Sequence, residues 1–109
     1  MPIDVKIESH IGEFKDALPK QIEQALIAIG MTAETHAKEK CPVDTGRLRN
    51  SITHEVDVNE QAAIIGSNVE YAAYVELGTS RQKPQPYLRP AAENHADEYK
   101  RIVESALKS

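Results

Sequence analysis

Hydrophobic positions near the start of the chain follow two different periods. Ile3, Val5 and Ile7 alternate with charged residues, the pattern of a half-buried strand. From Ile11 to about Lys40, apolar residues recur every three or four positions. This spacing predicts a long amphipathic helix after a short first strand.

Pro19 lies inside the helical stripe and leaves two possibilities open. Because proline fits the first turn of a helix but breaks its interior, either the helix begins near Pro19 or it is kinked there. Lys38 and Lys40 suit the negative end of a helix dipole, and Pro42 prevents continuation. The helix is therefore predicted to end near Lys40.

The middle of the chain predicts a capped turn and then a hairpin. Asp44 and Thr45 can cap backbone N–H groups of a turn that begins at Gly46, with Leu48 packing inward. The side chains of Arg47 and Arg49 would then point away. Residues 51–58 and 62–67 both resemble strands, and the three polar residues between them favour a β-hairpin.

The last third predicts two helices joined by a proline-rich loop. Residues 69–77 favour a two-turn helix that ends at Gly78. Residues 79–86 form a loop by composition, and Pro90 suits the first turn of a final helix that runs towards the C-terminus. We therefore expect a single α+β domain over residues 1–109, in which a small antiparallel sheet packs against a long N-terminal helix and a C-terminal helix.

Composition narrows the choice of function. The net charge of −4 gives no chain-wide basic surface for nucleic acid, although a local contact is still open. Cys41 is the single cysteine, so an intrachain disulfide is excluded. Neither a secretion signal nor a membrane-spanning run is predicted, which favours a protein made and used in a cytoplasm.

Catalytic and metal chemistry find little support in the sequence. Glu55 and Asp57 share one strand face, but a solvated face explains them better than an acid/base pair. Cys41 would lie at the negative end of a helix dipole, which disfavours a reactive thiolate. The four histidines are scattered without metal-binding spacing: His10, His36, His54 and His95. We predict no catalytic site, no metal and no cofactor.

A local basic loop stands out from this acidic chain. Residues 79–90 contain Arg81, Lys83 and Arg89 and no acidic residue. Tyr74 and Tyr87 flank the loop, and tyrosine and arginine are enriched at protein interfaces. The composition fits either a solvated positive loop or a docking arm.

Three spaced motifs together resemble one known family. They are CPVDTGRLRNSI (residues 41–52), YAAYVELGTS (residues 71–80) and PQPYLRPA (residues 84–91). In this order, and with a helix after them, they resemble the gene-product-ten family of head–tail connector or tail-completion proteins of lambdoid long-tailed phages and prophages. The resemblance covers the chain from about residue 38 to its end.

The resemblance implies a mostly structural role for the residues on its motifs. They are Asp44, Thr45, Gly46, Leu48, Arg49, Tyr71, Tyr74, Val75, Glu76, Gly78, Thr79, Pro86, Tyr87, Leu88, Arg89, Pro90 and Ala91.

The resemblance also implies a role in virion assembly. A hexameric or larger ring of the subunit, assembled on a template, would lie in the neck or at the tail end and join the filled head to the tail. Its partners would be further copies of itself and other neck, connector and tail-tube proteins, with DNA only as passing cargo. It would act in the virion, and in the host cytoplasm during assembly, without a membrane.

A closed ring requires two different complementary surfaces on each subunit. We hypothesise that the basic loop of one subunit docks on the acidic hairpin of the next. The residues expected at this contact are Tyr74, Arg81, Lys83, Tyr87 and Arg89 on the loop, and Glu55, Asp57 and Glu60 on the hairpin.

Two other functions are weighed against this one. A small nucleic-acid-binding module could use the arginines near residues 47–49 and the basic loop, but a pI of about 5.5 opposes it. A hydrolase or nuclease would need an acidic or metal cluster that the sequence does not show.

Overall fold

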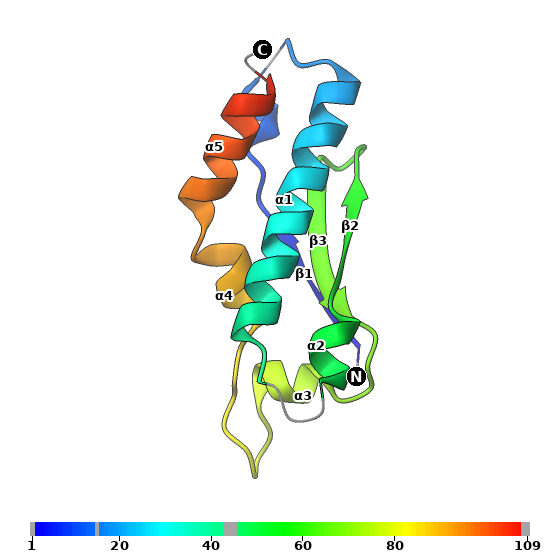
Figure 1. The fold of residues 1–109 in the computed structure, drawn as a ribbon, viewed down its shortest axis with the longest axis vertical. Helices are drawn as coiled ribbons and strands as arrows, with labels where there is room; N and C mark the ends of the chain where they lie inside the picture. Colours follow the sequence, from blue (N-terminus) through cyan, green and yellow to red (C-terminus); the bar gives the residue numbers. More distant parts are fainter. Residues whose placement is uncertain (1, 15, 43–45, 108–109) are drawn as a thin grey trace.

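The computed structural model describes residues 2–14, 16–42 and 46–107 (Figure 1). Strand β1 and a 3-10 helix precede the long helix α1, and the short helix α2 precedes the hairpin β2–β3. Three helices, α3, α4 and α5, complete the chain. The bounds are β1 Ile3–Ile7, the 3-10 helix Ile11–Glu13, α1 Pro19–Lys40, α2 Arg47–Ser51, β2 Thr53–Asp57, β3 Ala62–Ser67, α3 Ala72–Leu77, α4 Leu88–Glu93 and α5 Ala96–Leu107.

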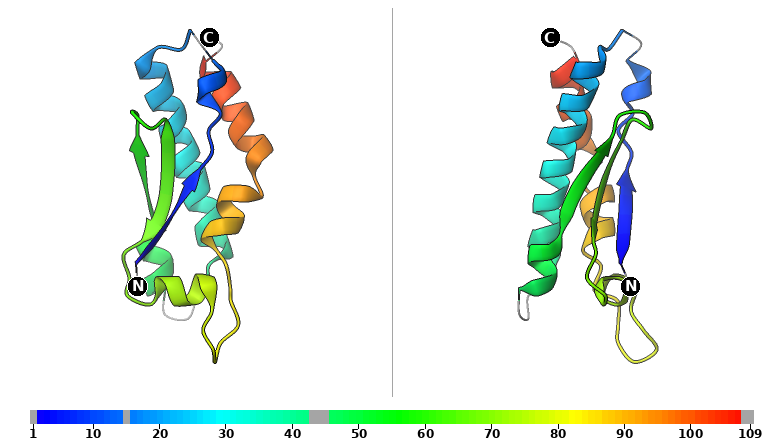
Figure 2. Two further views of the ribbon diagram at one scale, coloured as in Figure 1. Left: turned by 180° about the vertical axis from the view of Figure 1, so that it is seen from behind. Right: turned by 90° about the vertical axis from the view of Figure 1, so that its right-hand side faces the viewer.

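The three strands form one antiparallel sheet in the order β1-β3-β2. In the middle of the sheet, Ile65 of β3 lies between Val5 of β1 and His54 of β2. Helices α1, α4 and α5 all lie on one side of this sheet (Figure 2). The predicted α+β class, with a long N-terminal helix and a C-terminal helix on a small sheet, is confirmed.

Helix α1 begins at Pro19 and not at Ile11, so the first of the two possibilities holds. Proline occupies the first helical position, where its missing N–H needs no partner. The side chain of Gln21 reaches back to accept the N–H of Leu18 at 3.0 Å. The predicted stripe is buried along the helix, with Leu26, Ile29, Ala33 and Ala37 all inaccessible to solvent.

The C-terminal region corrects the prediction of one continuous helix. The chain forms α4 and α5, with Asn94 and His95 between them, and Pro90 is the third residue of α4. The break lets α4 pack against both β1 and α1, while α5 follows α1. The buried hydroxyl of Tyr99 in α5 donates a hydrogen bond to the carbonyl of Ala91 in α4, and burial raises the pKa of Tyr99 to about 12.

The predicted turn after Gly46 is a short helix. Residues 47–51 form the helical turn α2, with Leu48 buried and Arg47 and Arg49 exposed as expected. The predicted capping residues, Asp44 and Thr45, lie outside the described residues.

Gly30 lets the hairpin approach α1 closely. A Cβ atom at this position would lie 2.7 Å from Cδ2 of His54 and within 3.2 Å of two more atoms of that side chain. His54 is also held by Glu34, whose Oε1 lies 2.8 Å from its Nδ1. The glycine therefore lowers helix propensity but makes room for the contact between α1 and β2.

We expect Gly30→Ala to lower the free energy of unfolding by about 1–2 kcal/mol, because overpacking outweighs the gain in helix propensity. His54→Ala removes the two closest atoms but keeps a Cβ at 3.2 Å, so in this background the same substitution should cost at least about 1 kcal/mol less. Urea unfolding of the four proteins of this double-mutant cycle measures both effects. Equal costs in the two backgrounds would contradict the contact.

The ion pair of Glu34 predicts a loss of stability in acid. Burial tends to raise the pKa of Glu34, but hydrogen bonds from His54 and Lys38 outweigh it and lower this pKa below its usual 4.5. A lowered carboxylate pKa contributes stability that is present above the usual value and is lost as the pH falls through the folded value. Below pH 4.5, the free energy of unfolding should fall less steeply for Glu34→Gln than for the wild type, whereas parallel curves would exclude this contribution.

Candidate interaction surface around the arm

Residues 79–86, here called the arm, leave the body between α3 and α4. The arm forms the lower tip of the molecule in Figure 1, and all of its residues are exposed. Thr79 and Gln82 exchange backbone hydrogen bonds of 2.9 and 3.3 Å, and the Thr79 hydroxyl accepts the N–H of Arg81 at 3.2 Å. The tip is therefore a small closed turn that displays Arg81 and Lys83.

The base of the arm is fixed to α3. The N–H of Gln85 donates to the carbonyl of Val75 at 2.8 Å. Gly78 ends α3 with φ of 77° and ψ of 174°, and Pro84 lies directly against it. These contacts give the projecting arm a defined direction.

Glu76 connects α3 to the start of α4. Its buried carboxylate accepts three backbone N–H groups, from Tyr87 at 2.8 Å, Leu88 at 2.8 Å and Arg89 at 3.0 Å. These are N–H groups that a helix start leaves without partners in the helix itself, and a negative charge is favourable there. Glu76 thereby closes the chain segment that contains the arm.

The structure corrects the expectation that Tyr87 is an exposed interface anchor. Tyr87 is inaccessible to solvent, and its hydroxyl donates to the carbonyl of Ala72 at 3.1 Å. Burial raises the pKa of this hydroxyl. Leu88 beside it is equally buried, so the PQPYLRPA motif fixes the arm to the core and does not present an aromatic anchor to a neighbour.

Arg89 also differs from its predicted place in the basic loop. It lies in α4, and its Nε is 3.3 Å from the carboxylate of Glu93. The arm itself therefore carries two of the three predicted cations.

Exposed apolar side chains lie beside these two cations. Tyr74 keeps 47% of its surface exposed and Leu77 keeps 64%, both on α3 next to the arm. We call Tyr74, Leu77, Arg81 and Lys83 the arm surface. The sequence did not identify Leu77 as an interface residue, because its position before Gly78 predicted only the end of a helix.

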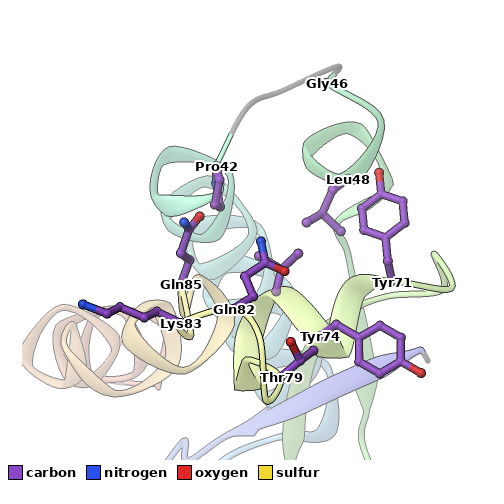
Figure 3. Close-up of a pocket in the computed structure, with 10 residues that line it drawn as sticks. Pro42, Gly46, Leu48, Tyr71, Tyr74, Thr79, Gln82, Lys83 and Gln85 are labelled. Atoms are coloured by element: carbon purple, nitrogen blue, oxygen red, sulfur yellow. The ribbon is translucent and has the colours of Figure 1, made fainter.

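A pocket of about 510 Å³ lies between the arm, α3 and the start of α2 (Figure 3). Residues from each of the three family motifs line this pocket. The lining residues are Pro42, Gly46, Leu48, Tyr71, Tyr74, Val75, Thr79, Gln82, Lys83 and Gln85. In Figure 3 the side chain of Lys83 extends away from the other lining residues, which places its charge at the rim.

Arg47 links α2 to the segment before α3. Its guanidinium donates two hydrogen bonds to the carboxylate of Glu70, at 3.0 and 2.9 Å, and lies 5.5 Å from the ring centre of Tyr71. The pair lowers the pKa of Glu70. Arg47 is therefore already engaged within the subunit, which weakens its proposed use in nucleic-acid binding.

The predicted acidic hairpin lies away from the arm. Glu55 and Asp57 are on β2, and Glu60 is in the loop that follows, towards the other end of the molecule in Figure 1. The Asp57 carboxylate accepts the N–H of Glu60 at 3.1 Å, and Glu60 lies 3.8 Å from the exposed Lys6 ammonium. Glu55 lines a surface depression of about 300 Å³ together with Asp4, and Asp57 is not among its lining residues.

The fold places the remaining candidate residues in different surroundings. Cys41 is buried at the end of α1, and burial raises its pKa, as expected for an unreactive thiol. His36 and His95 are brought together with Glu98, although 59 positions separate the two histidines. In the sequence, the spacing of three positions between His95 and Glu98 is only a weak indication of such a cluster. His36 joins it because α1 packs against α5, which the sequence alone does not show.

Within the described residues, every helix is too short or too polar to cross a lipid bilayer.

Comparison with known families identifies one match. The family described as "Bacteriophage HK97-gp10, putative tail-component" matches residues 6–78, about two thirds of the chain. No curated protein and no solved structure matches significantly. The matched region begins within β1, contains α1, α2, β2, β3 and α3, and ends where the arm begins.

Proposed function

The chain belongs to the HK97-gp10-like family of phage tail components, and from this we propose that it completes the tail and joins it to the head as a ring-forming subunit. Membership makes the chain a structural phage protein of the virion. The ring, its contact between subunits and the joining of head to tail are the proposed steps. The role requires no catalysis and no cofactor.

The observation that supports a ring is the separation of two complementary surfaces on an elongated subunit. The described molecule extends 50 × 22 × 22 Å, with the arm at one end of the long axis (Figure 1). Arg81 and Lys83 are exposed there, whereas Glu55, Asp57 and Glu60 lie along the hairpin. Opposite charges that are kept apart within a subunit can meet between subunits, as a head-to-tail ring requires.

The apolar part of the arm surface gives this contact an anchor. Tyr74 and Leu77 are large and exposed, and tyrosine is among the side chains that most often contribute the largest binding energies at the centre of a contact. The charges on the arm would then select the orientation of the neighbour. In the proposed contact between subunits, Tyr74 keeps its expected place, and Leu77 takes the place of the buried Tyr87.

The acidic balance of the chain suits a ring around DNA. A net charge of −4 disfavours tight phosphate contacts, so DNA can pass as cargo instead of being held.

Complementation of a phage that carries a stop codon in this gene tests the contact. Plasmid-supplied Arg81→Glu/Lys83→Glu should lower the phage titre by more than about tenfold, because like charges would face each other in the ring. Glu55→Lys/Asp57→Lys should do the same, and a subunit with all four changes should recover part of the titre.

The matched control reverses two exposed lysines elsewhere, Lys20→Glu/Lys100→Glu, and should leave the titre unchanged. Circular dichroism of each purified variant separates lost docking from lost folding. Full titre with the reversed arm would contradict the proposed contact.

A further inference from the structure

Two histidines and a glutamate meet between α1 and the start of α5. Nε2 of His36 lies 2.6 Å from Oε1 of Glu98, and Nδ1 of His95 lies 3.8 Å from the same oxygen. The two imidazole rings are stacked, with centres 3.5 Å apart and planes within 4° of each other. One nitrogen or oxygen from each of the three residues falls in a group whose members are all within 4.8 Å.

We propose that His36, His95 and Glu98 bind a divalent transition-metal ion of the zinc class. The donor set of two imidazole nitrogens and one carboxylate oxygen is one that Zn²⁺ accepts. It contains too few oxygens for a dedicated Ca²⁺ or Mg²⁺ site. The family match ends at residue 78, before His95 and Glu98, and the proposed assembly role does not use the three residues.

The ligand atoms lie near the separations of such a site, but the two rings must turn out of their stack to bind one ion, because the lone pairs of an imidazole lie in the plane of its ring. In a tetrahedral site with bonds of about 2.0–2.1 Å, neighbouring ligand atoms are about 3.3 Å apart. In the structure, His36 Nε2 and Glu98 Oε1 are closer than this, at 2.6 Å. All three ligand atoms lie within 4.8 Å of one another. The ion would take the place of the proton shared by His36 and Glu98 and would draw His95 closer.

The surroundings leave room for a further ligand. The side chains of His95 and Glu98 are 32% and 40% exposed, so water can complete the coordination. A surface depression beside the cluster is also lined by the carboxylates of Glu93 and Asp97 and by Arg101. Because Glu93 is paired with Arg89, the charges of these neighbours nearly balance, and Glu98 itself supplies the negative charge of the site.

The partially buried His36 has a second carboxylate nearby. Its Nδ1 lies 3.9 Å from Oε2 of Glu39, one turn along α1, which is beyond hydrogen-bond distance. A carboxylate that accepts a hydrogen bond from the second nitrogen of a ligating histidine fixes its ring, and Glu39 could do so after a small approach. The site would connect α1 to the junction of α4 and α5. Helix α4 joins this junction to the base of the arm.

Calorimetric titration of the metal-free full chain, prepared without a histidine tag, with ZnCl₂ tests the site. We expect one Zn²⁺ per chain, a higher melting temperature with ZnCl₂ and no shift with MgCl₂. His36→Ala, His95→Ala and Glu98→Gln should each weaken binding by at least about tenfold. CoCl₂ should give the visible absorption of a tetrahedral or five-coordinate ion in the wild type and not in the three cluster variants.

The matched control is His10→Ala, which removes an exposed histidine that is not one of the three proposed ligands and should bind Zn²⁺ as the wild type does. Glu98→Gln keeps a side chain of the same shape, so it remains informative if an alanine variant fails to fold. Absence of Zn²⁺ binding by the wild type, or binding unchanged in all three cluster variants, would overturn the proposal and leave the cluster as a packing contact.

Discussion

Replacement of Glu76 by alanine is expected to lower the free energy of unfolding by about 3–5 kcal/mol. The buried carboxylate accepts the N–H groups of Tyr87, Leu88 and Arg89, and alanine would leave all three without this partner. Small domains are stable by only about 5–15 kcal/mol, so the loss is a large share of the total. Urea unfolding by linear extrapolation measures it.

Glu76→Gln removes the negative charge of the side chain and keeps its shape. The carboxamide oxygen can still accept the two N–H groups that now share Oε1, but its NH₂ group would face the N–H of Arg89. We expect a smaller loss than for alanine, and faster hydrogen exchange at residues 87–89 in both variants. Glu93→Gln, on an exposed side chain that pairs with Arg89, is the control and should change stability by less than about 0.5 kcal/mol. A loss below about 1 kcal/mol for Glu76→Ala would show that water replaces the carboxylate.

The second large effect is expected for Gly78→Ala, with a loss of about 1–3 kcal/mol and a displaced arm. The backbone at φ 77° and ψ 174° lies in a region that is essentially restricted to glycine. An added Cβ would also lie 2.8 Å from Cδ and N of Pro84. The strain can be relieved only by moving the base of the arm away from α3.

Hydrogen exchange separates the overall loss of stability in Gly78→Ala from the displacement of the arm. The N–H of Gln85, which donates to Val75, should lose protection more than the core of α1 does. Gly12→Ala is the matched control, since its Cβ would meet only the side-chain oxygen of Gln61 at 3.8 Å, an ordinary contact. An unchanged Gln85 amide together with full stability would contradict the described base of the arm.

Periodicity predicted the layers of the fold because each element buries one continuous face. The stripe through Leu26, Ile29, Ala33 and Ala37 is the buried side of α1, and alternation gave β1 and the hairpin. The break at Asn94 and His95 was not predicted, because apolar residues keep helical spacing on both sides of it. It depends on α4 and α5 having different packing partners, which only the tertiary structure defines.

The candidate interaction surface was predicted in part. Composition found the exposed cations Arg81 and Lys83, but it could not tell that Tyr87 is inside, because tyrosine is frequent both in cores and at interfaces. The function of Glu76 was also hidden. A glutamate on a short helix is usually solvated, and its N–H partners lie eleven to thirteen positions later in the chain.

Electron microscopy of particles from a phage lysate is the most direct test of the proposed role in joining head to tail. Wild-type lysate is compared with lysate from a strain in which this gene carries a stop codon, and a plasmid-borne copy of the gene provides the rescue. A joining role predicts DNA-filled heads beside separate complete or overlong tails, and joined virions again after rescue. Normal joined virions without the gene product would contradict it.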